Sequence, residues 1–355
     1  MSIKVNLSER VLHFKQPAGT SRGVYTERRI WLVTVTDGQR TGVGECAPLP
    51  QLSCDDVPDY SEELRVKSEE FAAAILEGDE AIAAFFETMR DYPSMLFGLE
   101  TALLAMQGST PAVGGAQLPV LFDTPFSRGE VGIPINGLVW MGTYDEMEQR
   151  IEDKLRQGFR CIKLKIGAID FDAELALVKK IRERFGPREV ELRVDANGAF
   201  PFDEALYKLE LLSQYALHSI EQPIKAGQWA NMAELCRESP LPIALDEELI
   251  GVNDPDQKRQ MLNIIKPRYI ILKPSLHGGI MGCREWIDTA RDMQIGSWMT
   301  SALESNVGLN AIAQFCSSVY GPDIRMPQGL GTGQLFTDNI PMPLEIRGDR
   351  LVIKT

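Results

Sequence analysis

Charged side chains recur at one position of a repeating pattern in the second half of the chain. Short apolar runs, each followed by a helical stretch, end in Lys, Asp or Glu five times in succession. A charge at the end of an apolar strand costs free energy unless it is paired or bound to a metal, so the repetition indicates a shared site. The five ends are Lys163-Leu164-Lys165, Asp195-Ala196-Asn197, Glu221-Gln222-Pro223, Asp246-Glu247-Glu248 and Lys273-Pro274.

The three middle ends supply carboxylates, from Asp195, Glu221 and Asp246. Carboxylate oxygens are the ligands that hard cations prefer, and a site with room for water and substrate suits Mg²⁺. We therefore expect these residues to bind Mg²⁺, with Mn²⁺ as an acceptable substitute. The cation would neutralise the charge that develops on a substrate carboxylate.

The two outer ends supply lysines. Lys163 and Lys165 point to the same side of their strand because side chains alternate along a strand, and the intervening strands place Lys273 across the pocket. This arrangement suits removal of a proton from the carbon next to a carboxylate. We expect all three lysines to be catalytic, with Lys165 as the base. Lys163 and the Mg²⁺ are both candidates for the positive charge that favours its neutral form.

The elements that must position these residues follow one another regularly from about residue 133. Apolar runs alternate with amphipathic helical runs at the spacing of a βα unit, which predicts parallel strands with right-handed crossovers. Seven strands can be read, at 133–139, 161–166, 190–194, 217–220, 242–245, 269–272 and 296–299, and a weak eighth near 323–326. The pattern favours a (β/α)7-8 barrel of TIM type over a doubly wound sheet, since no strand is followed by a GxGxxG or P-loop motif.

The first 125 residues have a different pattern. Strands are expected at 5–11, 29–36 and 42–46, with Asp37-Gly38 as a turn, followed by helices near 60–76, 81–89 and 95–106. We predict an α+β capping domain at 1–125, a barrel at 126–333, and a tail at 334–355 that returns to the cap as a strand pair turning at Gly348-Asp349.

Composition limits the class of protein. The net charge of −13 argues against nucleic acid and anionic membranes as partners, and the six cysteines show no CxxC or zinc spacing. The N-terminal sequence has no apolar stretch typical of a signal peptide, and no apolar run is long enough to span a membrane. We expect a cytoplasmic protein with reduced thiols that acts on a small carboxylate. The oligomeric state stays open.

The motifs KxK, DxN, EQP, DE and KP on successive strands resemble the enolase superfamily, muconate lactonizing enzyme subgroup, over residues 133–333. The cap resembles it more loosely, through residues 44–50. The resemblance implies the capped barrel, the Mg²⁺ site and a lysine base. None of the three histidines, His13, His218 and His277, matches the catalytic histidine of mandelate-racemase-like members.

Within the subgroup, residues 300–305 (TSALES) and 329–333 (GLGTG) are similar to the o-succinylbenzoate synthase family. Dipeptide epimerases usually carry a DxD near the eighth strand, where this chain has Asp323-Ile324-Arg325. The resemblance implies a carbon–oxygen lyase that dehydrates SHCHC (2-succinyl-6-hydroxy-2,4-cyclohexadiene-1-carboxylate) to 2-succinylbenzoate in menaquinone biosynthesis. The alternatives are an N-acylamino acid racemase, a dipeptide epimerase or a muconate cycloisomerase on the same scaffold, or a non-catalytic metal-binding barrel.

Several roles stay open at this stage. Asn197 and Ser301 are candidates for substrate binding, but each could instead cap the helix that follows it. Asn197 could also contact the ligands of the metal. Glu247 could orient Lys273 or a metal ligand, or form a plain ion pair. Glu248 is expected to be solvated or to support the site from behind. The loops 16–22 and 48–56 are candidates for a lid, with ordinary exposed loops as the alternative.

Overall fold

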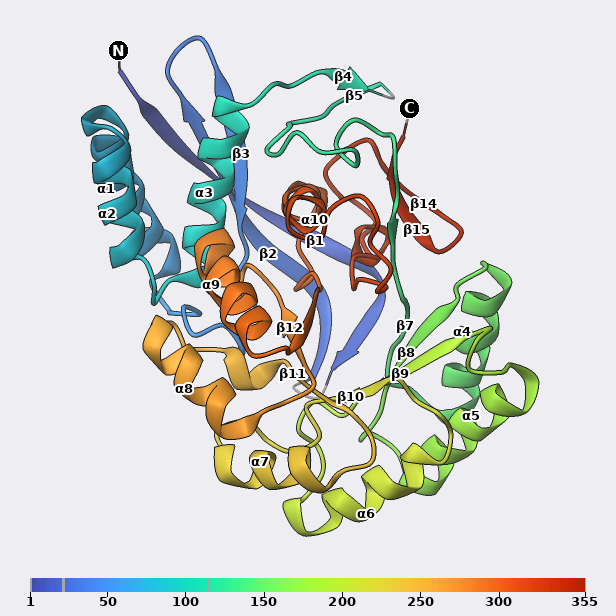
Figure 1. Cartoon of the computed structure of the whole chain (residues 1–355). Coiled ribbons are helices and arrows are strands. Elements are labelled where there is room, and N and C mark those ends of the chain that lie inside the picture. The colour runs from blue at the N-terminus through green and yellow to red at the C-terminus, as the bar shows by residue number, and fades with distance from the viewer. Residues whose placement is uncertain (1, 21–22, 114, 355) are drawn as a thin grey trace.

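The computed structural model describes residues 2–20, 23–113 and 115–354, which form a sheet-and-helix cap on a barrel (Figure 1). β1 (Lys4–Thr20), β2 (Gly23–Thr36) and β3 (Thr41–Cys46) form an antiparallel sheet in that order. The expected turn between β2 and β3 is present: the Asp37 carboxylate accepts the N–H groups of Gln39 at 2.9 Å and Arg40 at 2.7 Å, and Gly38 adopts φ +90°.

The cap helices are α1 (Tyr60–Glu77), α2 (Asp79–Thr88) and α3 (Pro93–Gln107). α3 packs between β3 and the barrel helix α9 (Gly279–Asp292) (Figure 1). Glycines in β3 permit this close packing, since a Cβ on Gly44 would lie 1.9 Å from the Gly98 carbonyl oxygen. The helix is therefore held directly on the sheet backbone.

The barrel strands are parallel and run in sequence order, which confirms the predicted fold class. They are β7 (Gly137–Val139), β8 (Cys161–Lys165), β9 (Glu191–Asp195), β10 (Ser219–Glu221), β11 (Ile243–Leu245), β12 (Tyr269–Leu272) and β13 (Gly296–Met299). The helices between and after them are α4 (Tyr144–Arg156), α5 (Phe171–Arg184), α6 (Phe202–Ser213), α7 (Trp229–Glu238), α8 (Pro255–Ile265), α9 and α10 (Asn306–Tyr320). The apolar strand residues and the inner faces of these helices form one core.

The predicted eighth strand near 323–326 is wrong in position. Those residues form no strand, and the ring is closed by bridges from Ile135 to Gln328 and from Thr300 to Gly329. Asp323 and Arg325 are exposed, and Pro327 has no N–H to donate to a ladder. The chain therefore reaches the barrel wall only at 328–329, where the buried Gln328 side chain accepts the Met299 N–H at 2.8 Å.

The C-terminal tail contacts two parts of the molecule. β14 (Leu344–Arg347) and β15 (Arg350–Ile353) form the expected hairpin, and β15 pairs with β6 (Ile133–Pro134) at the start of the barrel. The preceding segment lies along β1, where the Lys15 N–H donates to the Leu335 carbonyl at 2.8 Å. The domain boundaries 1–125, 126–333 and 334–355 stay a prediction.

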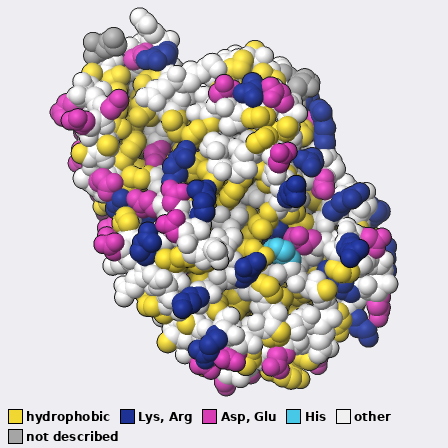
Figure 2. Space-filling view, in the orientation of Figure 1, with side chains coloured by type: hydrophobic (Ala, Val, Ile, Leu, Met, Phe, Trp, Pro, Cys, Tyr) yellow, Lys and Arg dark blue, Asp and Glu magenta, His cyan; other side chains and the backbone are white. Residues whose placement is uncertain are grey.

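The remaining elements are short. β4 (Ala112–Val113) pairs with β5 (Ala116–Gln117), and 3-10 turns occur at η1 (Glu247–Leu249) and η2 (Thr332–Gln334). Acidic and basic side chains intermingle over the face seen in Figure 2. Of the helices formed by the described residues, none is both long and apolar enough to cross a membrane.

Candidate active site

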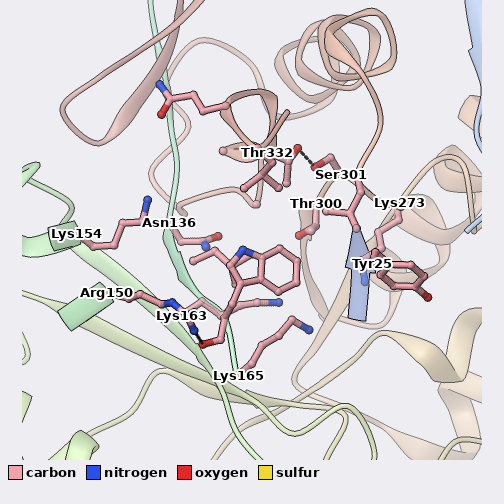
Figure 3. A pocket seen from close by; sticks show the side chains of 18 of the residues that line it. Tyr25, Asn136, Arg150, Lys154, Lys163, Lys165, Lys273, Thr300, Ser301 and Thr332 are labelled. Carbon is pink, nitrogen blue, oxygen red and sulfur yellow. Dashed lines mark hydrogen bonds between the residues drawn. The ribbon is translucent and has the colours of Figure 1, made fainter. Parts of the chain in front are cut away.

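The charged strand ends meet at one end of the barrel. In the sheet register Lys165 lies opposite Asp195, and Asp195 lies opposite Glu221, so the predicted residues stand at the same level on neighbouring strands. Lys163, Lys165 and Lys273 line a cavity of about 330 Å³, and the carboxylates of Asp195, Glu221 and Asp246 contact these lysines. Lys163 and Lys165 reach it from one side, and Lys273, Thr300 and Ser301 reach it from the other (Figure 3).

The lysines and carboxylates interdigitate. Lys163 Nζ lies 2.6 Å from Glu221 Oε2 and 3.0 Å from Asp195 Oδ2. Lys165 Nζ lies 3.0 Å from the same Asp195 oxygen, and Lys273 Nζ contacts Asp246. Burial alone lowers the pKa of Lys163, but Asp195 and Glu221 raise it above its ordinary value. The positive charge expected to act on Lys165 is therefore held between two acids.

Two carboxylate oxygens at the centre of the site accept no hydrogen bond from the described residues. These are Glu221 Oε1 and Asp246 Oδ1, both buried. Burial and the neighbouring charges of Asp195 and Asp246 raise the pKa of Glu221 well above its ordinary value. An oxygen-seeking divalent cation would satisfy both oxygens and offset this repulsion, so the three acids fit Mg²⁺.

The ion pairs between lysines and carboxylates explain why the three carboxylates are not already arranged around a metal position. Within the described ranges, no group of three or more His, Cys, Asp or Glu side chains is arranged to hold a metal ion. Each of Asp195, Glu221 and Asp246 turns an oxygen toward a lysine. The ammonium groups thus occupy positions on the carboxylates that a cation would take.

Asn197 and Ser301 both line the cavity, and neither caps a helix. Asn197 Oδ1 accepts from Lys165 Nζ at 2.7 Å, while its Nδ2 donates to Glu247 Oε1 at 2.9 Å. Helix α6 is preceded by Pro201, and α10 is capped by Ser305. The capping alternatives are therefore wrong for both residues. Ser301 Oγ instead bonds Thr332 Oγ1 at 2.5 Å (Figure 3).

The two acids after Asp246 differ. Glu247 lines the cavity and is held by Asn197. Glu248 is 3% exposed and accepts from Gln222 Nε2 at 2.9 Å and from the Gly227 N–H at 2.8 Å. A solvated Glu248 is thus wrong, because the side chain ties two barrel loops together behind the site.

Sequence reasoning missed Arg28, which is buried between cap and barrel. Its guanidinium donates to the carbonyls of Ala47 at 2.6 Å and Leu303 at 3.3 Å, and also to that of Pro48. Leu49 and Leu303 line the cavity, so Arg28 fixes two loops of the wall. Its position in β2 was the signal that could have revealed its burial. Arg28 lies two residues before Ile30, so both side chains point to the same buried face of the strand.

The cap also contributes directly to the cavity wall through Gln16, Tyr25, Leu49 and Leu52. Tyr25 donates its hydroxyl to the Pro50 carbonyl at 3.0 Å. These positions fall in or next to the segments 16–22 and 48–56 that were candidates for a lid. Arg22 lies outside the described residues.

Known protein families match both the N-terminal cap and the barrel of this chain. Residues 146–353 match the family described as enolase C-terminal domain-like, and residues 20–106 match the MenC N-terminal domain. The o-succinylbenzoate synthase of Desulfotalea psychrophila is 47% identical over 96% of each chain. The L-Ala-D/L-Glu epimerase of Bacillus subtilis is 26% identical over 89% of this chain and 85% of its own length.

A solved structure agrees with the sequence comparison. The crystal structure of MenC from D. psychrophila LSv54 superposes with a TM-score of 0.84 at 40% identity, over 99% of this chain and 100% of that chain. The capped barrel, the charged strand ends and both family matches lead to one assignment: the chain belongs to the enolase superfamily, among the members that carry a MenC N-terminal domain.

Proposed function

We propose that the chain is an o-succinylbenzoate synthase that dehydrates SHCHC to 2-succinylbenzoate, a step of menaquinone biosynthesis. The observation that carries the proposal is the placement of Lys163 and Lys165 across one cavity from Lys273 (Figure 3). All three lysines contact buried carboxylates. The name of the relative that is 47% identical over nearly the whole chain supports this choice of substrate.

Asp195, Glu221 and Asp246 would hold Mg²⁺, or Mn²⁺ in its place, because a cation would satisfy the buried oxygens Glu221 Oε1 and Asp246 Oδ1. When bound, the metal supplies positive charge for the substrate carboxylate next to the reacting carbon. The chain's own residues then position and move the proton.

Lys165 would remove the proton from C1 of SHCHC. Asn197 and Asp195 hold its Nζ at the cavity wall before substrate binds. The electron pair of the broken C–H bond enters the ring, the C6–O bond breaks, and the departing hydroxyl takes the proton from Lys165 to leave as water. Because one lysine gives back the proton it took, a single base serves both steps and the ring becomes aromatic.

Lys273 would remain a cation on the opposite side. Burial lowers its pKa, but Asp246, Glu221 and Glu247 together raise it above the ordinary value. A charged ammonium there stabilises the negative charge that develops on the substrate carboxylate. Asn197 and Ser301, which line the same cavity, would contact the substrate.

An assay of purified protein with SHCHC and Mg²⁺, followed by ultraviolet absorbance, tests the proposal against the alternatives. We expect dehydration of SHCHC and no efficient exchange of the α-proton of an Ala-Glu dipeptide in D₂O. Asp323 and Arg325 are exposed and do not line the cavity, so nothing there offers an acidic pair for an ammonium group. Dipeptide exchange as fast as SHCHC turnover would favour an epimerase instead, and absence of both reactions would favour a non-catalytic barrel.

A further inference from the structure

The cavity holds more positive charge than the proposed chemistry uses. Among the residues that the structure describes, the lysines and arginines lining it are Arg150, Lys154, Lys163, Lys165 and Lys273. The last three are ion-paired with Asp195, Glu221 or Asp246. Arg150 and Lys154, one turn apart on α4, have no carboxylate within 4.0 Å in the described part of the chain. Figure 3 shows this pair entering from the side away from Lys273.

Lys154 is the member of this pair with an uncommitted head group. Arg150 Nη1 donates to the carbonyls of Trp140 at 3.0 Å and Met141 at 2.9 Å, which fixes it to the backbone. The Lys154 ammonium makes no hydrogen bond to any described residue, and its neighbour Asp153 is bonded to Arg156. Lys154 Nζ lies 5.1 Å from the centre of the Phe159 ring.

The strand beside Lys154 is shaped around its side chain. A Cβ added to Gly137 would lie 3.2 Å from both Cβ and Cδ of Lys154, and 3.0 Å from Phe159 Cγ. Glycine at this position therefore lets the lysine stem lie against β7. The half-buried location lowers the pKa of Lys154 through burial, and an anion in the cavity would offset that desolvation.

A second polar group lines the same cavity as this lysine. Asn136 precedes Gly137, is 6% exposed and lines the same cavity. Its side-chain amide makes no hydrogen bond to the described residues, although an amide can donate two. Neither amide atom is among the buried polar atoms that lack a partner, so the amide is open to the cavity, and Asn136 and Lys154 can both donate to an acceptor there.

We propose that Lys154, with Asn136, binds a second carboxylate of the substrate, the one that ends its succinyl chain. This inference rests on the proposed function, because SHCHC carries one carboxylate at the reacting ring and another at the end of the chain. The ion-paired lysines and the acids that would hold Mg²⁺ act at the ring carboxylate. Lys154 and Asn136 supply the positive charge and the donor for the second, and so select dicarboxylates over substrates with an apolar tail.

The test compares two probes that differ only in that carboxylate. 2-Succinylbenzoate and 2-butyrylbenzoate, in which a methyl group replaces the chain carboxylate, are titrated calorimetrically with Mg²⁺ present. The proteins are wild type, Lys154→Met, Lys154→Arg, Asn136→Leu and Arg150→Met. Lys179→Met on α5, whose side chain is exposed, controls for the loss of one positive charge elsewhere.

We expect wild type and Lys179→Met to bind the succinyl probe more tightly than the butyryl probe. Lys154→Met should lose about 10-fold or more in affinity for the succinyl probe, as expected for a hydrogen bond to a charged group, and little for the butyryl probe. Lys154→Arg should restore most of the loss and Asn136→Leu should show part of it. For SHCHC turnover, KM should rise by the same factor while kcat changes little, because the chain carboxylate is remote from the bonds that break.

Two results would overturn the inference. One is unchanged discrimination between the probes in Lys154→Met, including an equal loss of affinity for both; the other is loss of discrimination in Arg150→Met instead. These outcomes are separate from the proposed function. If wild type does not dehydrate SHCHC, the proposed function fails, while the two probes still report on Lys154. If Lys154→Met turns over SHCHC with unchanged KM, only the carboxylate subsite fails.

Discussion

Lys165 and Lys273 carry the same charge but meet different partners. Lys165 contacts Asp195 and the neutral Asn197, whereas Lys273 contacts Asp246 and lies near Glu221 and Glu247. The more acidic surroundings of Lys273 favour its charged form. The two lysines are therefore suited to different tasks, one to proton transfer and the other to charge stabilisation.

This difference predicts an asymmetry between substitutions. Lys165→Ala should abolish SHCHC dehydration and exchange of the C1 proton with solvent, because no other base lies in its place. Lys273→Arg, which keeps the charge, should retain more activity than Lys273→Ala, although the planar head group is bulkier. Steady-state rates and deuterium incorporation measure both effects, and Mg²⁺ binding should persist in all three variants. Near wild-type turnover by Lys165→Ala would contradict the mechanism.

The metal site gives a second prediction at this scale. Asp246→Asn should reduce activity strongly, because it removes one of three proposed ligands and one negative charge. The fold should persist, since Glu221 and Glu247 still compensate the charge of Lys273. Far-UV circular dichroism should stay native while SHCHC turnover is lost. Treatment of wild type with EDTA should abolish turnover reversibly, and full activity after EDTA would refute the metal site.

The residues of the catalytic cluster could be predicted because each stands at the end of a strand in a regular repeat. Arg28 and Glu45 could not be assigned in the same way. Their partners at 302–308 lie far away in the sequence, and no local pattern joins one segment to the other. The partners of Asn197 and Ser301 were missed for the same reason.

At the level of elements, two acids of the cap bind the N-termini of barrel helices. Glu45 of β3 accepts the N–H groups of Ser305 and Gly308 at the start of α10, each at 2.8 Å. Glu100 of α3 accepts those of Ile280 at 2.6 Å and Met281 at 2.9 Å in the first turn of α9. The first N–H groups of a helix have no partner within it, so these contacts orient both helices against the cap.

Removing one of these acids should weaken the whole protein. Glu45→Ala should lower the free energy of unfolding by about 2–3 kcal/mol, because it leaves buried N–H groups at the start of α10 without an acceptor. Urea denaturation followed by fluorescence measures the loss. Glu210→Ala, an exposed acid on α6, should change stability by no more than about 0.5 kcal/mol. Equal stability of the two variants would show that the Glu45 contacts contribute little.

Most of the helices and strands could be predicted because apolar residues repeat with different periods in the two kinds of element. The sequence pattern misplaced the eighth strand, because 323–326 has polar alternation but no partner, whereas 328–329 is too short to show a period. The capping box of Thr143 and Glu146 marks the start of α4. That short signal locates a helix end but not what the helix faces, so the contribution of Lys154 to the cavity could not be foreseen.

At the scale of the whole molecule, the chain ends are joined by a contact between His13 of β1 and Asp338 of the tail. His13 Nδ1 lies 2.8 Å from Asp338 Oδ2, and the His13 N–H donates to Oδ1 at 2.8 Å. The hydrogen bond that the His13 ring donates to Asp338 raises the pKa of His13. The backbone N–H of His13 lowers the pKa of Asp338. Both groups are exposed, so the contact is open to salt and pH.

The signs of these shifts define a pH window for the attachment. A raised histidine pKa contributes stability below the ordinary value of about 6.5, and this contribution is lost as pH rises through the raised value. The lowered pKa of Asp338 contributes stability above about pH 4. This contribution is lost as the pH falls through the lowered value. The contact should therefore be strongest between these limits. In an NMR titration His13 should titrate above about 6.5, and Asp338→Asn should bring its midpoint down.

His218 and His277 serve as internal references in that titration, because burial lowers the pKa of both. Their midpoints should not move in Asp338→Asn. If the His13 midpoint is the same in wild type and variant, the ion pair does not form in solution.

Two single bridges, at Gln328 and Gly329, close the ring of barrel strands, and this closure should come late in folding. The β7–β13 sheet can assemble from neighbouring units, but joining Ile135 to Gln328 must wait until almost the entire barrel sequence has been gathered. Contacts between such distant segments form slowly, because the entropy of closing the loop is lost before any contact compensates it. An open sheet should therefore precede the closed ring. In refolding with pulsed hydrogen exchange, the amides of Asn136 and Ser301, which donate to the carbonyls of 328–329, should gain protection after those of Ile166 and Ala196.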